Sequence, residues 1–339
     1  MSSSHRPFEV NQLDEKKKKS MKSRVIVGVI LAVTGLPAVF LGGWFFFVFI
    51  SFFLGFAIFE AINTPRKKYH WTVWAFTYVI TVSYVYWGLI KSNIQAYLAS
   101  PETYAFSLEN HFVEPGISWY AIIASLGVYF LIGLFHKDFT IHDITFLFAM
   151  SIFVGMGFQC MLFMRFHPLA LANYADNDYV YRFVISAFLF LYVVIATFGN
   201  DTMAYFVGVL FGKHKMSARV SPNKSWEGFF GGVILGGGLA FAFACIVEAC
   251  GHPILQNLRL FGPDGKWWAW AILSFTIPLI GVLGDLSLSL IKRHYGIKDY
   301  GRLLAAHGGV LDRVDSLTFC CIYTSILLVI FEKGVSFFA

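Results

Sequence analysis

Long apolar stretches recur along almost the whole chain, and they constrain its fold more than any other feature. A helix needs about 20 mainly apolar residues to cross the hydrocarbon core of a bilayer. Such stretches cover residues 24–42, 43–62, 71–90, 117–136, 142–164, 179–198, 228–250, 267–291 and 315–333. Only 14% of the residues are charged, against about 25% in soluble domains. The sequence therefore predicts an all-α, polytopic integral membrane protein with about nine transmembrane helices.

Segment 199–212 is apolar but short, and Asn200 and Asp201 lie at its start. A spanning segment rarely opens with an ionised group, because polar groups at membrane depth must be buried in protein or line a watery cavity. We therefore expect one short re-entrant or interfacial helix here. Residues 1–22 are polar and contain four consecutive lysines, which predicts a disordered, basic cytoplasmic tail.

The distribution of Lys and Arg predicts the orientation in the membrane. If the N-terminus is inside and segment 199–212 does not cross, the inside segments hold 20 of the 26 Lys and Arg residues. Cytoplasmic loops are enriched in these residues. We therefore expect a cytoplasmic N-terminus, an external C-terminus and cytoplasmic polar loops at 213–224 and 292–313. Anionic lipid headgroups account for the net charge of +6, so we expect no nucleic-acid partner.

Aspartates stand out in the C-terminal part of the chain. Asp285 interrupts an apolar helix, and a charge at membrane depth is functional by default because it is costly; a structural partner for a lysine is the alternative. Asp312 and Asp315 begin the last helix, three residues apart, which predicts a shared face. Two such carboxylates repel each other unless a cation lies between them, and Mg²⁺ prefers carboxylate oxygens. The alternative is capping of a helix N-terminus by acids.

Two polar segments add donors for anions. Ser221-Pro-x-Lys224-Ser225 precedes a helix, and a helix N-terminus with a serine and a lysine favours an anion; an ordinary basic loop with a helix cap is the alternative. His307-Gly308-Gly309 allows close backbone approach to a ligand, although, taken alone, a plain turn is the better interpretation. Glycines at 231–232 and 236–238 are typical of transmembrane helix packing.

Together, these carboxylates, cations and glycines indicate phosphoryl or nucleotidyl transfer at one membrane face. The C-terminal region also resembles a known family, the phosphatidate cytidylyltransferases or CDP-diacylglycerol synthases. The similarity is carried by Ser289-x2-Lys292-Arg293-x4-Lys298-Asp299, His307-Gly-Gly-x2-Asp312-Arg313-x-Asp315, Ser221-Pro-x-Lys-Ser-Trp-x-Gly228 and Asp201-x2-Ala-Tyr205. It covers about residues 196–325, and the residues within these motifs are closer to those of bacterial members of the family. One departure is Ala305-Ala306, where the family usually has Pro-Gly.

The resemblance implies that CTP and phosphatidate react to give CDP-diacylglycerol and pyrophosphate. We expect the chain to divide into N-terminal transmembrane helices (23–198) and a C-terminal catalytic transmembrane domain (199–339). It implies Mg²⁺ as cofactor, with Mn²⁺ or an added monovalent ion left open, and a homodimer. The implied metal ligands are Asp285, Asp312, Asp315 and Asp201. The implied catalytic residues are Lys224, Asp285, Lys292, Asp312 and Arg313. The implied substrate-binding residues are Ser221, Ser225, Arg293, Lys298, His307, Gly308 and Gly309.

Three alternatives remain open from the sequence. A CTP-dependent polyprenol kinase would transfer the γ-phosphate instead of the nucleotidyl group. A transporter would also place a charge such as Asp285 inside the membrane. An inactive paralogue would be explained by Ala305-Ala306.

Overall fold

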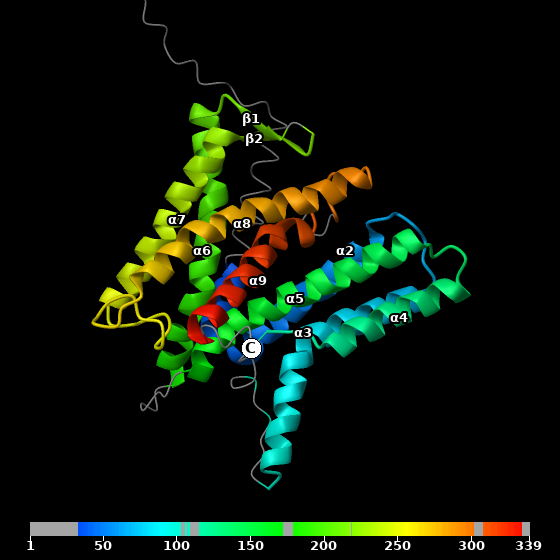
Figure 1. Cartoon of the computed structure of the whole chain (residues 1–339), viewed down its shortest axis with the longest axis horizontal. Coiled ribbons are helices and arrows are strands. Elements are labelled where there is room, and N and C mark those ends of the chain that lie inside the picture. The colour runs from blue at the N-terminus through cyan, green and yellow to red at the C-terminus, as the bar shows by residue number, and fades with distance from the viewer. Residues whose placement is uncertain are drawn as a thin grey trace, which may run out of the picture.

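The computed structural model describes residues 33–333, except 103–105, 107, 109–114, 172–178, 218 and 302–307. Helices dominate this part of the chain (Figure 1). They are α2 (Gly43–Asn63), α3 (Trp71–Ala99), α4 (Trp119–Phe135), α5 (Ile141–Leu171), α6 (Tyr179–Phe211), α7 (Trp226–Ala249), α8 (Trp267–His294) and α9 (Leu311–Lys333). Between α6 and α7, strands β1 (Lys215–Ser217) and β2 (Ser221–Ser225) pair in antiparallel orientation.

The prediction of an all-α, polytopic membrane protein is confirmed. Within the described residues, seven helices are long and apolar enough to cross a membrane, and α4 is a shorter apolar helix of 17 residues. Each predicted apolar stretch from 43–62 onward coincides with one of these helices. The predicted helix over 24–42 lies mostly outside the described residues, and the predicted tail over 1–22 lies wholly outside them.

Segment 199–212 does not form the separate re-entrant or interfacial helix that the sequence predicted. Helix α6 continues through it as one helix of 33 residues. The reason is the glycine face of α7. A Cβ on Gly232 would lie 2.6 Å from Oδ1 of Asn200, and one on Gly236 would lie 2.6 Å from the backbone of Asn200. Because Asn200 is buried against this face, its polar group is kept from lipid without a helix break.

Helix α9 lies between the N-terminal helices and α8. It packs against α5, α6 and α8, with Phe319 contacting Phe153 of α5 and covering Gly284 of α8. A Cβ on Gly284 would lie 2.7 Å from the Phe319 ring, so glycine permits this close approach. The packing sets the start of α9 beside the C-terminal half of α8, where the aspartates lie.

The polar loops gather at one end of the helix bundle, along the top and the right of Figure 1. Lys67 donates to Asp143 at the start of α5, 2.7 Å away. His142 of α5 faces His294 at the end of α8. Arg293 donates through Nε to the carbonyl of Val220, in the β1–β2 turn. We call this the polar-loop end; it comprises residues 64–70, 136–140, 212–225 and 295–301. The segments predicted to face the cytoplasm thus share one end.

Candidate active site

Three helices bring one aspartate each toward a common region. Asp201 comes from α6, Asp285 from α8 and Asp315 from α9. Each of the three pairs of carboxylates interacts electrostatically. We call these three residues the carboxylate cluster. Like charges at short range repel, so the cluster is stable only with cations beside it.

Lysine and arginine side chains supply those cations. Nζ of Lys224, on β2, lies 2.5 Å from Oδ2 of Asp285. Asp201 also interacts with Lys224 and Arg313, and Asp315 interacts with Lys292. The side chains of Lys224 and Asp285 remain 26% and 29% exposed, so this pair is accessible to a ligand. The lysine partner considered for Asp285 is therefore present, and it comes from the segment predicted to bind anions.

Asp312 has different partners from Asp315. Its Oδ1 accepts from Nζ of Lys292 at 2.8 Å. Its Oδ2 accepts from the backbone nitrogens of Tyr300 at 2.8 Å and Gly309 at 2.9 Å. Asp315 instead accepts from the backbone nitrogen of Ser316 and interacts with Asp201 and Asp285. Asp312 therefore holds the loop before α9, in the manner of an acid in the first turn of a helix.

Tyr300 completes the contacts around Lys292. Its hydroxyl donates to the carbonyl of Leu288 at 3.0 Å, and Nζ of Lys292 lies 5.4 Å from its ring centroid. Burial, together with the charges of Asp312 and Asp315, raises the pKa of Tyr300 above its usual range. The hydroxyl therefore stays protonated, and the ring offers a cation–π contact to Lys292.

Glu60 is a residue that the sequence interpretation missed. It lies on α2, is 3% exposed, and accepts from the backbone nitrogens of Val310 and Leu311 at 2.9 and 2.8 Å. It thereby satisfies donors at the start of α9, which a helix cannot satisfy internally. A Cβ on Gly309 would run into this carboxylate, which explains the glycine. An acid within the apolar stretch 43–62 was the signal that could have found it.

The structure describes most of the remaining predicted substrate-binding residues. The hydroxyl of Ser225 accepts from Gly228 at 3.2 Å and caps α7. Ser221 pairs with Ser217 in the hairpin, and Lys298 is exposed. Gly308 has φ +84°, a left-handed conformation that favours glycine. His307 and Ala305-Ala306 lie outside the described residues.

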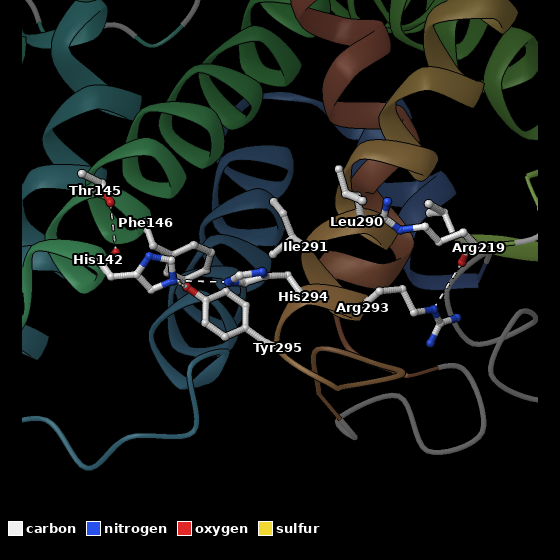
Figure 2. Close-up of a pocket in the computed structure, with 10 residues that line it drawn as sticks. His142, Thr145, Phe146, Arg219, Leu290, Ile291, Arg293, His294 and Tyr295 are labelled. Carbon is white, nitrogen blue, oxygen red and sulfur yellow. Dashed lines mark hydrogen bonds between the residues drawn. The ribbon is translucent and has the colours of Figure 1, made fainter.

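A cleft of about 560 Å³ lies next to this region, at the polar-loop end. Figure 2 shows its lining side chains, which come from α5, α8 and the hairpin. They are His142, Thr145, Phe146, Arg219, Val220, Leu290, Ile291, Arg293, His294 and Tyr295. We call it the histidine cleft. It holds Arg293 but none of the carboxylate cluster.

The donor set of the cluster is suited to a hard cation. Among the described residues, no three His, Cys, Asp or Glu side chains converge closely enough to hold a metal ion by themselves. Mg²⁺ is usually held by one or two carboxylates, with substrate phosphates and water completing its shell. One or two of the carboxylates of Asp201, Asp285 and Asp315 would therefore suit a cation that binds together with a phosphate-bearing substrate.

A carboxylate cluster balanced by cations, at the polar end of a polytopic helix bundle, defines a membrane enzyme that handles phosphate groups. The comparison with known families is specific: the model of the cytidylyltransferase family matches residues 22–331. The chain belongs to this family.

Curated relatives extend over nearly the same length. A phosphatidate cytidylyltransferase of Bacillus subtilis is 28% identical over 312 residues, which is 92% of this chain and 99% of the relative. The one of Staphylococcus haemolyticus is 30% identical over 91% of this chain and 99% of its own. The one of Haemophilus influenzae is 44% identical over 150 residues, covering 44% of this chain and 47% of its own.

Proposed function

We propose that this protein transfers the cytidylyl group of CTP to phosphatidate, giving CDP-diacylglycerol and pyrophosphate. One observation carries the proposal: Lys224 pairs with Asp285 and interacts with Asp201, and both of these aspartates interact with Asp315. The chain around that site aligns over 91–92% of its length with relatives named phosphatidate cytidylyltransferase. The surrounding helices suit a lipid substrate, because its acyl chains remain in the bilayer while its headgroup reaches the polar-loop end.

The reaction is a direct substitution at phosphorus. An oxygen of the phosphatidate phosphate forms a bond to the α-phosphorus of CTP. The bond from that phosphorus to the oxygen bridging to the β-phosphorus breaks, and pyrophosphate leaves with the electron pair. No group of the protein needs to become covalently attached. The protein contributes positioning and charge stabilisation, as in other phosphoryl transfers.

In this proposal, Lys224, Lys292 and Arg313 neutralise phosphate oxygens. Lys224 is paired with Asp285 and Lys292 with Asp312 in the structure. When a phosphate group binds, the ammonium group of each lysine either moves from its aspartate to a phosphate oxygen or contacts both. The ion pairs therefore hold both lysines extended toward the site before substrate binds, which reduces the entropy lost on binding.

We further propose that Asp285, with Asp201 and Asp315, holds Mg²⁺; Mn²⁺ and an added monovalent ion are the alternatives. When bound, the metal would supply positive charge to the phosphates that react. Asp312 could join as a ligand only if Lys292 released its Oδ1, since its other oxygen accepts two backbone donors. Asp285 needs a smaller change, because its partner Lys224 has a long and partly exposed side chain.

The same proposal fixes the orientation. The polar-loop end, where the site lies, would face the cytoplasm, with the N-terminus on that side and the C-terminus outside. Labelling of single cysteines introduced at Lys68 and at Asp264 in intact cells tests this, once the exposed native Cys250 is replaced by serine: only the cysteine at 264 should react with an impermeant reagent. From the family resemblance we also propose a homodimer, to be tested by the mass of the purified protein in detergent.

The direct test uses the purified protein in detergent micelles with phosphatidate, Mg²⁺ and CTP labelled at the α-phosphate. Label should enter the lipid with wild type and be lost with Asp285→Asn. Transfer of label from γ-labelled CTP to a prenol, without transfer from α-labelled CTP, would instead establish a kinase. If neither label is transferred by wild type, and transfer appears when Ala305-Ala306 is changed to Pro-Gly, the protein is an inactive paralogue.

A further inference from the structure

The histidine cleft gathers hydrogen-bonding groups that the reaction at the carboxylate cluster does not use. Nε2 of His142 lies 3.3 Å from Nε2 of His294 and 3.3 Å from the hydroxyl of Tyr295. Figure 2 shows these three groups converging between α5 and the end of α8. Burial and the charge of Asp143 raise the pKa of Tyr295 above its usual value, so this hydroxyl remains a donor. Each group can donate to an oxygen that enters between them.

The charge of the cleft favours an anion. Arg219 and Arg293 contribute two fixed positive charges, and no Asp or Glu is among the lining residues. Asp143 follows His142 in sequence, but its carboxylate is already bound by Lys67, Tyr69 and Thr140. An arginine with imidazole and phenol donors is a typical set for a phosphate group.

The other walls of the cleft are apolar. Phe146, Leu290 and Ile291 line it beside the charged groups. Leu290 is 47% exposed, and Leu283, two turns earlier on α8, is 55% exposed. Residues seven apart lie on the same face of a helix, so an exposed apolar face of this membrane-spanning helix leads to the cleft. A ligand that fits both features has an anionic head and hydrocarbon chains.

We propose that the histidine cleft is an entry site for phosphatidate. Its headgroup, with the phosphate and the glycerol ester oxygens, spans the cleft from the side of Arg219 and Arg293 to the side of His142 and Tyr295 (Figure 2), while its acyl chains lie along the Leu283–Leu290 face of α8. The identity of the lipid rests on the proposed function. Arg293 is eight residues from Asp285, which is about 12 Å along a helix. The cleft is thus a separate site next to the carboxylate cluster, where a lipid is held before its phosphate moves to the metal-binding aspartates.

The test measures binding without catalysis. Calorimetric titration of the full chain in micelles, without CTP or metal, gives the Kd for dioctanoyl phosphatidate. His142→Gln and Arg219→Gln should each raise this Kd about ten-fold, the effect of losing one hydrogen bond to a charged group. Lys68→Gln removes an exposed cation of the polar-loop end that lies outside the cleft, and it should leave the Kd unchanged.

Two further arms distinguish the sources of the phosphate. Leu290→Gln should weaken binding of dioctanoyl phosphatidate but not of glycerol 3-phosphate, which carries the same phosphate without acyl chains. The Kd of CTP should stay the same in all variants, and this also shows that the variants are folded. If His142→Gln and Arg219→Gln weaken CTP and spare the lipid, the cleft is a nucleotide site and the proposal is overturned.

The outcome is separable from that of the proposed function. If cytidylyl transfer occurs in wild type and the cleft variants bind phosphatidate normally, the entry site is wrong and the enzyme proposal stands. If no transfer occurs but the cleft variants lose lipid affinity, the cleft binds a phosphate-bearing lipid in a protein with another activity. In an active enzyme, the cleft variants should raise the KM for phosphatidate and leave the KM for CTP unchanged.

Discussion

The two ends of the helix bundle solve the same structural problem with a buried glutamate. At the polar-loop end, Glu60 accepts from the consecutive backbone nitrogens of Val310 and Leu311. At the opposite end, Glu248 of α7 accepts from those of Leu260 and Phe261, at 2.7 and 3.1 Å. This second loop lies at the lower left of Figure 1. In both places, a carboxylate satisfies backbone donors that protein burial keeps from water.

The difference between the ends lies in what surrounds each glutamate. Near Glu248, Nε of Arg259 lies 3.5 Å from the carboxylate. Near Glu60, the same loop that it anchors is also held by Asp312, and Asp312 is paired with Lys292. Glu248 therefore holds a connecting loop, whereas Glu60 holds the loop that leads into the carboxylate cluster. The comparison teaches that a buried acid in a membrane helix is not by itself a mark of catalysis.

The sharpest contrast between the ends should come from removing one carboxylate charge at each. Asp285→Asn should lower the rate of cytidylyl transfer about 10²–10³-fold, the size of effect found when a preorganised charge-stabilising group is lost. Asp264→Asn changes an exposed acid in the loop of the opposite end and should leave the rate unchanged. The labelled-CTP assay measures both. Equal rates for wild type and Asp285→Asn would remove the cluster from the mechanism.

The two glutamates provide a matched pair. Glu60→Gln and Glu248→Gln each replace an acceptor of two backbone hydrogen bonds, and each should lower the free energy of unfolding by about 1.5–3 kcal/mol. Only Glu60→Gln should also lower the transfer rate, because it releases the loop at Gly308-Gly309 and the start of α9. Denaturation in detergent, with the assay on the folded fraction, separates the two effects. A loss of rate in Glu248→Gln would contradict the division between the ends.

The helix pair that joins the two ends can be tested with two glycines of α7. In Gly236→Ala, the new Cβ would lie 2.6 Å from backbone atoms of Asn200, so α6 and α7 must move apart at a cost of about 1–3 kcal/mol. Gly238 has no atom within 4 Å of the same position. Gly238→Ala should therefore raise stability by up to about 1 kcal/mol through helix propensity. Thermal unfolding of both variants measures the difference, and equal midpoints would contradict the close packing.

The smallest effect is expected where the ion pair is partly open to solvent. Lys67→Gln removes a lysine that is 43% exposed from its pair with Asp143, and pairs of this kind contribute at most about 1 kcal/mol. Asp143 keeps its hydrogen bonds from Tyr69 and Thr140. Lys68→Gln, at the exposed neighbour, should have no effect on thermal unfolding. A destabilisation well above 1 kcal/mol would show that Lys67 is needed to offset the desolvation cost of the buried Asp143 carboxylate.

The length of the apolar stretches predicted most of the fold, because the length of a spanning helix is set by the bilayer. It failed at segment 199–212, where the polar pair Asn200-Asp201 suggested a break. The sequence contained the glycines of α7 that make the break unnecessary, but their packing against Asn200 depends on the register between two helices. That register follows from side-chain contacts along α6 and α7, and no local pattern reveals it.

The candidate site shows the same division. The sequence determined the chemistry of the residues: carboxylates and cations in an otherwise apolar chain, whose cost in a membrane indicates a function. It did not determine that Asp312 and Asp315 take different partners, that Lys224 reaches Asp285, or that Glu60 anchors the start of α9. Only the tertiary structure decided these pairings, because they join segments as far apart as α2 and α9. A local pattern fixes which groups a helix presents, whereas packing between helices fixes which of those groups meet.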